Sequence, residues 1–308
     1  MENTKISTMR HLLVIMSLLL LLSTKGEAAT SSIDCSSASL QAAIDKAKPG
    51  DTIFVNGTCN ENLNILEEVQ RITLDGQGKA TINGPDKNTA TITVLGRGIT
   101  IKGFIVRGGQ RGILVFRGGT AVVEGNTVEN VAAQHGVQVA QSSSARIINN
   151  TIRSNPGHGI LVTSSSQAFI GFLSTSDTTA RPNTIQNNGG DGIQVMRTSS
   201  AVINGNTITD NKRTGVTVQG ASDADIRGNT INSNGRDGIF VTKNSTVSLG
   251  SATGSGLFQL PNTTGALNSG FGIRCSINSS ADGRLGTLNG SKGAKDFTET
   301  SCVDSLIP

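Results

Sequence analysis

The chain has 308 residues and a formal net charge of +4, from 26 Lys and Arg against 22 Asp and Glu. Charges of both signs are interspersed, without the basic block that a nucleic-acid-binding surface requires, so we expect no nucleic-acid partner. There are 38 Gly but no Trp and no Tyr. A compact core of this size normally uses large aromatic residues, so the composition favours a narrow interior filled by Ile, Val, Leu and Ala.

Residues 1–28 are predicted to be a targeting segment. Lys5 and Arg10 form a basic start, residues 12–22 are an apolar run, and small residues follow at Ala28 and Ala29. The run is too short for a membrane-spanning helix, so we interpret these residues as a signal peptide. No later stretch reaches the length of a membrane span. We therefore expect an exported protein, secreted to the extracellular space or the periplasm, without a membrane span.

A short amphipathic helix is expected over residues 36–46. Apolar residues between positions 40 and 47 recur at helical spacing, and serines precede them as helix caps. Such a helix would cover the apolar end of a repeat structure, which otherwise invites pairing with another chain. We predict that residues 29–60 form this N-terminal cap and the first coil.

Residues 61–275 are organised as a repeat. A Gly followed by Ile or Val recurs at Gly112, Gly136, Gly159, Gly192, Gly215, Gly238 and Gly272. Asn-Thr-Ile or a variant recurs in step at Asn126, Asn150, Asn183, Asn206, Asn229 and Asn262. The intervals are 23 or 24 residues in most units and 33 or 34 in the others. Two series that stay in step indicate a repeat architecture.

Each unit contains three short segments of alternating apolar and polar residues. In the unit that begins at Gly215, Val216 and Val218 are expected to point inward, as are Ala224 and Ile226. Strands this short, with no helix between them, cannot be βαβ units, but each can pair with its equivalent in the next coil. We predict an all-β chain that forms a single-stranded right-handed parallel β-helix, with three short strands per coil and an N-terminal capping helix.

The recurring asparagines are predicted to be structural. Asn tolerates the left-handed conformation of tight corners, and its amide can bond the same residue one coil away. A further series stands at Asn155, Asn188, Asn211 and Asn234. The two longest units carry about ten extra residues after the second strand, at 172–181 and 251–260, which we interpret as loops.

The four cysteines form two sequence-local pairs, Cys35 with Cys59 and Cys275 with Cys302. An even number of cysteines in an exported chain favours disulfides. Of the three connectivities, only these local pairings are geometrically reasonable, because the two ends of a solenoid lie far apart. Metal ligation is the competing interpretation, but CxxC spacing is absent. We predict that residues 276–308 form the last coil and a C-terminal cap.

Residues 40–82 carry a family resemblance. Leu40 begins Leu-Gln-Ala-Ala-Ile-Asp-Lys-Ala-Lys-Pro-Gly-Asp-Thr-Ile-Phe-Val, and Ile72 begins Ile-Thr-Leu-Asp-Gly-Gln-Gly. These segments resemble the entry coils of the pectin-lyase-like superfamily of right-handed β-helix proteins, and the later Gly-Asn-Thr-Ile units resemble its generic repeats. The resemblance covers about residues 35–290 and is closest to uncharacterised secreted bacterial members. It implies the fold, whereas the activities of the superfamily range from lyases, hydrolases and epimerases to adhesins.

The catalytic motifs of that superfamily are largely missing. Of the polygalacturonase elements only Gly157-His158-Gly159 is present, without an Asp-Asp pair, Asn-Thr-Asp or Arg-Ile-Lys. The Asp-Pro-His pattern of alginate epimerases is absent. Hydrolysis and lysis of acidic glycans both need clustered carboxylates, and the outward positions of the Gly-Ile strands carry none. No catalytic residue is assignable, and the sequence leaves open whether the chain is an enzyme while favouring a non-enzymatic role.

One series of polar residues is a candidate ligand-contact or metal site. The residues just before the Gly-Ile and Gly-Val pairs include Arg111, His135, His158, Asp191 and Asp237. They are expected at one corner of successive coils, about 5 Å apart. A stacked His-His-Asp set can bind Ca²⁺ or a transition metal, or act as acid and base, although no cofactor is firmly predicted. The competing interpretation is a polar turn position without function.

Three functions are compatible with these features. The first is a non-enzymatic secreted or envelope protein whose surface binds an acidic polysaccharide or another envelope glycan. Arg111 and the candidate glycan-contact residues Arg117, Arg197 and Lys243 would supply the cations. The second is a lyase, hydrolase or epimerase acting on an acidic glycan at the corner, and the third is a periplasmic metal-binding β-helix. The missing acidic cluster favours the first, and we expect a monomer.

Overall fold

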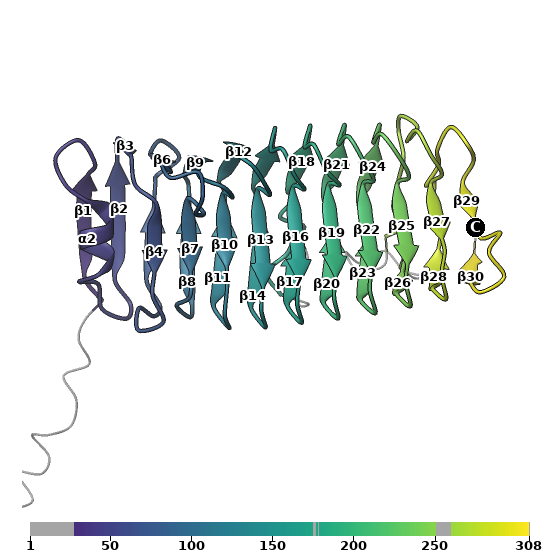
Figure 1. The fold of residues 1–308 in the computed structure, drawn as a ribbon, viewed down its shortest axis with the longest axis horizontal. Helices are drawn as coiled ribbons and strands as arrows, with labels where there is room; N and C mark the ends of the chain where they lie inside the picture. The colour runs from purple at the N-terminus through teal and green to yellow at the C-terminus, as the bar shows by residue number, and fades with distance from the viewer. Residues whose placement is uncertain (1–27, 175–176, 178, 251–259, 308) are drawn as a thin grey trace, which may run out of the picture.

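The structure is a computed structural model, which describes residues 28–174, 177, 179–250 and 260–307. Within this part of the chain, the strands form three parallel sheets of twelve, ten and eight strands. Figure 1 shows the sheets running along one straight stack of coils. The signal-peptide prediction concerns residues that lie almost entirely outside the described part.

Most coils add one strand to each sheet, whereas the coils at the ends contribute to only one or two of the sheets. The twelve-stranded sheet contains β1 (Thr30–Asp34), β2 (Thr52–Asn56), β5 (Thr73–Asp75), β8 (Ile99–Lys102), β11 (Thr120–Glu124), β14 (Ser144–Ile148), β17 (Gln167–Ile170), β20 (Ser200–Asn204), β23 (Asp223–Arg227), β26 (Thr246–Ser248), β28 (Ser280–Arg284) and β30 (Val303–Ile307). The ten-stranded sheet contains β4 (Leu63–Ile65), β7 (Ile92–Val94), β10 (Ile113–Val115), β13 (Val137–Ala140), β16 (Ile160–Thr163), β19 (Ile193–Met196), β22 (Val216–Gln219), β25 (Ile239–Thr242), β27 (Ile273–Cys275) and β29 (Lys295–Asp296). The eight-stranded sheet contains β3 (Thr58–Cys59), β6 (Thr81–Asn83), β9 (Ile105–Gly108), β12 (Thr127–Val131), β15 (Thr151–Arg153), β18 (Thr184–Gln186), β21 (Thr207–Thr209) and β24 (Thr230–Asn232). The predicted parallel β-helix with three short strands per coil is confirmed.

The interior is a continuous column of aliphatic side chains. In the unit that begins at Gly215, Val216, Val218 and Ile226 are fully buried and Ala224 nearly so, as predicted. Strands of neighbouring coils pair in register, so that each inward residue stacks on an aliphatic residue of the next coil. Burial of these stacked side chains is the main favourable contribution to folding, at roughly 25 cal/mol per Å² of apolar surface.

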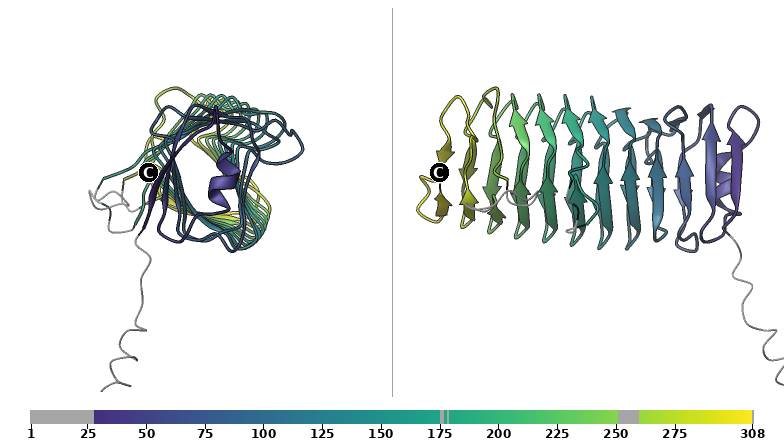
Figure 2. Two further views of the ribbon diagram at one scale, coloured as in Figure 1. Left: turned by 90° about the vertical axis from the view of Figure 1, so that its left-hand side faces the viewer. Right: turned by 180° about the vertical axis from the view of Figure 1, so that it is seen from behind.

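The helix α2 (Leu40–Ile44) closes the N-terminal end of the interior. In the view along the solenoid axis it lies across the opening of the coils (Figure 2). Its first and last residues, Leu40 and Ile44, are buried, and Ser39 caps the helix by accepting the Ala42 N–H at 3.2 Å. The helix is shorter than the predicted 36–46, because the N–H groups of residues 37 and 38 both bond the carbonyl of Asp34 and form a turn instead.

Two disulfides join the ends of the solenoid to their neighbouring segments, as predicted. Cys35 is bonded to Cys59 and Cys275 to Cys302, with Cα–Cα distances of 4.9 and 6.0 Å. At the C-terminal end Phe297 and Leu306 are partly buried against the core. The chain therefore has a cross-link and covering side chains at each end of its stack.

The asparagines form two internal ladders, as predicted. In each ladder the side-chain oxygen of one Asn accepts bonds from both the backbone N–H and the amide of the Asn one coil earlier. The second ladder extends to Asn268, which the sequence did not single out. A third ladder, also missed, uses serine hydroxyls in the same way and contains Ser143, Ser166, Ser199, Ser222, Ser245 and Ser279.

The first predicted loop follows β17 and precedes β18, as the longer repeat implied. Its first residue, Phe172, is fully buried, and the ring of Phe172 contacts that of Phe169 edge to face, with the ring centroids 5.5 Å apart. The second predicted loop lies, apart from Leu260, outside the described residues.

The asparagine ladder makes a stability prediction for Asn188→Ala. This change leaves the buried Asn155 N–H and Ile152 carbonyl without their side-chain partners. Each orphaned group costs about 1–3 kcal/mol, so the free energy of unfolding should fall by about 3 kcal/mol or more in urea denaturation. The adjacent Asn187 is exposed and has a φ of 56°, which glycine adopts freely. Asn187→Gly should therefore change stability by less than about 0.5 kcal/mol, and equal losses in the two variants would contradict the ladder.

Candidate functional site

The predicted corner residues lie in one column along the ten-stranded sheet. The N–H of Gly112 bonds the His135 carbonyl, and those of Gly136 and Gly159 bond the carbonyls of the next two column residues, at 3.0–3.1 Å. Four members therefore occupy four consecutive coils, namely Arg111, His135, His158 and Asp191. Asp237 belongs to the same column but lies two coils beyond Asp191, with the buried Thr214 between them.

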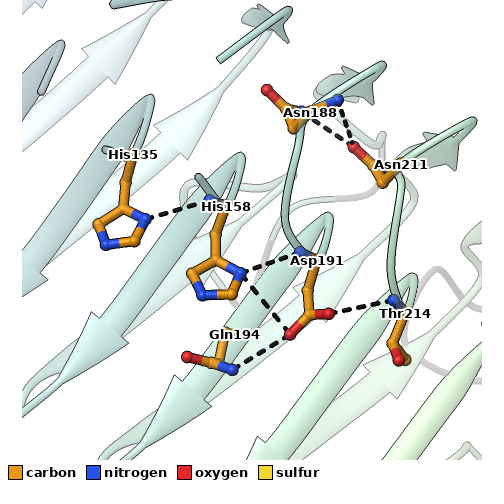
Figure 3. Close-up of polar contacts among 7 residues, drawn as sticks. All are labelled: His135, His158, Asn188, Asp191, Gln194, Asn211 and Thr214. Carbon is orange, nitrogen blue, oxygen red and sulfur yellow. Dashed lines mark hydrogen bonds and ion pairs between the residues drawn. The ribbon is translucent and has the colours of Figure 1, made fainter. Parts of the chain in front are cut away.

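The polar side chains of this column accept backbone hydrogen bonds from the next coil. Nδ1 of His135 accepts the His158 N–H at 3.1 Å, and Nδ1 of His158 accepts the Asp191 N–H at 2.9 Å (Figure 3). Oδ1 of Asp191 in turn accepts the Thr214 N–H at 3.0 Å. The two imidazole rings stack with centroids 4.9 Å apart. At this corner imidazole and carboxylate side chains thus both accept a backbone N–H of the next coil, which explains why both residue types occur there.

These hydrogen bonds fix the protonation of the histidines. Because Nδ1 accepts an N–H, its lone pair is engaged and the single proton of the neutral ring lies on Nε2. Burial lowers the pKa of His135 to about 3, with further contributions from His158 and Arg111. Burial also lowers the pKa of His158, and Arg213 adds to this effect while Asp191 opposes it. His135 is therefore a neutral hydrogen-bond donor throughout the physiological range.

The arrangement limits what the column can do chemically. A metal ion or an additional proton binds a histidine ring only at a nitrogen with a free lone pair. Nε2 carries the ring proton, and the lone pair of Nδ1 accepts the backbone N–H of the next coil. Both oxygens of Asp191 are also occupied, since Oδ2 accepts the Gln194 amide at 3.1 Å. In the described part of the chain no three His, Cys, Asp or Glu side chains are gathered as a metal site. Metal binding at this corner stays a hypothesis, and it would require a different histidine tautomer.

Two polar atoms near the start of the column have no hydrogen-bond partner. Nη1 of Arg111 donates to Gln110, but its buried Nε meets no acceptor among the described residues. Gln138, on the outward face of β13 in the next coil, has a buried Oε1 that meets no donor there. Buried orphans of this kind are uncommon and mark sites where a water or ligand completes the bonding. The sequence predicted that Gln138 points outward, but no sequence pattern indicated that its side-chain oxygen lacks a partner.

The three candidate glycan-contact cations also share a column. Arg117, Arg197 and Lys243 each stand six residues after a corner residue, in left-handed turns with φ of 49°, 57° and 59°. The backbone bonds of successive turns place them at equivalent positions, and all three side chains are exposed. Six extended residues span roughly 20 Å. The cations therefore border the ten-stranded sheet on the edge opposite the corner column.

The face between the two columns is closely packed. Its outward side chains include Leu161, Gln194 and Thr217, which are only 7%, 9% and 5% exposed because in-register neighbours cover them. Towards the C-terminal end, Arg274 lies over the Phe240 ring at 4.3 Å. Contacts with a ligand would consequently come from the two polar edges more than from the middle of the sheet.

The three parallel sheets define the class of the protein as a right-handed parallel β-helix. Residues 51–172, 87–253 and 161–280 match the family model described as right handed beta helix region. Together these matches cover most of the chain, which belongs to the right-handed β-helix family.

Similar proteins share the fold at low sequence identity. The chain is 27% identical over 190 residues to the "Cell surface glycoprotein" of Methanothermus fervidus, which covers 50% of this chain but only 32% of that protein. Pectate lyase Pel9A superposes with a TM-score of 0.57 at 13% identity, over 89% of this chain and 81% of its own. The A-module of the Azotobacter vinelandii mannuronan C-5 epimerase AlgE6 gives 0.52 at 14%, over 92% and 91%. At these identities the structural likeness shows the fold alone.

The geometry of the histidines makes a spectroscopic prediction. Long-range ¹H–¹⁵N correlation spectra should show His135 with the proton on Nε2 and no titration between pH 8 and pH 5. In urea the same ring should titrate near the ordinary pKa of 6.5. A folded-state midpoint near 6.5, or a proton on Nδ1, would contradict the assigned hydrogen bond.

The lowered pKa also makes stability depend on pH. The unfolded ring binds a proton below about pH 6.5, whereas the folded ring stays neutral until about pH 3. The contribution of His135 is therefore fully present above pH 6.5 and is lost progressively as the pH falls towards 3. His135→Asn keeps an acceptor but does not titrate, so its stability should fall less than that of the wild type between pH 7 and pH 5. If urea denaturation gave the same change in stability with pH for the wild type and His135→Asn, this expectation would be wrong.

Proposed function

We propose that this chain is an exported β-helix protein that binds an acidic polysaccharide along the outer face of its ten-stranded sheet without cleaving it. The observation that carries the proposal is that two buried polar atoms on adjacent coils, Arg111 Nε and Gln138 Oε1, have no hydrogen-bond partner among the described residues. A uronate suits these two side chains, because its carboxylate accepts from a guanidinium and its hydroxyls bond an amide.

The neighbouring side chains extend this donor surface. His135 and His158 present Nε2–H groups from stacked rings 4.9 Å apart, directly after Arg111 in the same column. Neither ring can take a proton at Nε2, so the pair supports oxygen binding more than general base catalysis. The column offers hydrogen bonds to carboxylate and hydroxyl oxygens in successive coils, which suits an extended ligand.

The second column supplies long-range attraction. Arg117, Arg197 and Lys243 are exposed, and they are spread over several coils along the same sheet. Exposed cations contribute modest energy individually and are screened by salt, but together they attract a polyanion and align it with the sheet. A surface bordered by hydrogen-bond donors on one edge and by exposed cations on the other fits a polymer better than a small molecule.

An extracellular setting is part of this proposal. Disulfides such as Cys35–Cys59 persist in oxidising compartments, and a related protein is a cell surface glycoprotein. Among the described residues no helix has the length and apolar character needed to cross a membrane. A surface location would bring the sheet into contact with envelope or extracellular glycans.

Arg111→Gln tests the proposal directly. Affinity electrophoresis of the wild type in gels containing polygalacturonate or alginate should show retardation, and neutral dextran should show none. We expect Arg111→Gln to weaken binding at least about tenfold, since it removes a charge-assisted contact. Arg107→Gln is the matched control, because Arg107 is an exposed cation of the same coil on β9 of the eight-stranded sheet. Retardation should also weaken between about 0.1 and 0.5 M salt.

The same preparations distinguish the enzymatic alternative. Unsaturated product measured by ultraviolet absorbance would establish a lyase and overturn the non-enzymatic part of the proposal. Equal losses in Arg111→Gln and Arg107→Gln, or equal retardation by dextran, would overturn the assignment of the face.

A further inference from the structure

A hollow of about 300 Å³ lies near the C-terminal end of the solenoid. It is lined by Gly235, Arg236, Asp237, Ser269, Gly270, Phe271, Arg274 and Lys292. Three of these eight residues are cationic and one is acidic, so the lining carries a net charge of +2. None of them is among the residues proposed above to bind a polysaccharide.

The hollow lies where a glycine interrupts a column of side chains. Backbone hydrogen bonds join Arg236 to Gly270, and Gly270 to Lys292, at one turn of three consecutive coils. Gly270 leaves the position between the two cations without a side chain. A Cβ at this glycine would collide with the carboxylate of Asp237. Asp237 therefore occupies the position in which a side chain of Gly270 would begin, and the two cations stand one coil to either side of this glycine.

The third cation is held in place by two contacts. Nε of Arg274 lies 3.1 Å from Oδ2 of Asp237, and its guanidinium lies over the ring of Phe240. Oδ1 of Asp237 accepts the Phe271 N–H at 2.9 Å, so both oxygens of this buried carboxylate are engaged. This contact is an ion pair without hydrogen-bond geometry, since the buried Nε has no hydrogen-bond partner among the described residues, and the Nη groups remain as donors. A guanidinium fixed in this way loses little freedom when it binds an anion.

We infer that this hollow is a binding site for an oxyanion group, a carboxylate, sulfate or phosphate, held by Arg236, Lys292 and Arg274. The single carboxylate present is neutralised by Arg274, which leaves Arg236 and Lys292 uncompensated by any lining residue. Planar or tetrahedral oxyanions match the donors of a guanidinium and an ammonium at close range. An apolar or cationic ligand would leave the two charges unpaired.

The test is an NMR titration of the full protein with sodium sulfate, sodium phosphate and sodium galacturonate, each at constant ionic strength kept with sodium chloride. The amide signals of Ser269, Gly270 and Phe271 should shift saturably with at least one of the three anions, and the comparison identifies the preferred one. In the double variant Arg236→Gln with Lys292→Gln, the dissociation constant should rise at least about tenfold. Arg213→Gln is the matched control, because Arg213 is exposed and lies one coil before Arg236 in the same column.

Each outcome decides the inference. The site is supported if the saturable shifts are lost in the double variant but remain in Arg213→Gln. It is also supported if the shifts remain in Arg111→Gln. Shifts that grow linearly with anion, that chloride reproduces, or that the double variant retains would overturn it. Because Arg111 lies far along the stack, loss of polysaccharide binding in Arg111→Gln leaves this test unaffected, so the two proposals fail separately.

Discussion

The structure depends on in-register stacking, in which nearly every residue lies on its equivalent in the next coil at the strand spacing of about 4.8 Å. Parallel pairing satisfies the backbone within the strands, and some corner N–H groups, such as that of Gly112, bond a backbone carbonyl of the next coil. Other buried corner N–H groups are met by side chains of the neighbouring coil, since buried backbone donors are rarely left unpaired. The asparagine and serine ladders meet this requirement inside the molecule. The polar corner column meets it near the surface.

This requirement explains why function is difficult to read from the polar residues of such a fold. His135, His158 and Asp191 form a set that, in a globular enzyme, would be a strong catalytic candidate. Here each of them accepts a backbone N–H, and Thr214 follows in the same position. The side-chain atoms that would be needed for catalysis are those that hold the coils together. What remains for a ligand is the outward edge of each ring and the unsatisfied atoms beside it.

The sequence predicted most of what repeats, although it missed the serine ladder. The alternation in the unit at Gly215, the asparagine series and the two cysteine pairs each follow from stacking, and the structure confirms them. Features set by a single local contact were not predictable. The capping helix is shorter than expected because the carbonyl of Asp34 accepts two N–H groups ahead of Ser39. The direction of the His135 Nδ1 bond and the orphaned Gln138 Oε1 depend on side-chain rotamers, which periodicity does not specify.

In a stacked repeat, a binding site is most easily made by interrupting a column. When every position is filled, as in the middle of the ten-stranded sheet, neighbouring side chains cover one another and leave Gln194 and Thr217 almost without exposure. When one coil carries a glycine, no side chain of that coil lies between the residues above and below it. Gly270 stands in this way between Arg236 and Lys292, while the carboxylate of Asp237 packs against the glycine and is paired with Arg274. The interrupted column therefore leaves two cations that no lining carboxylate neutralises, which is the charge that an anion requires.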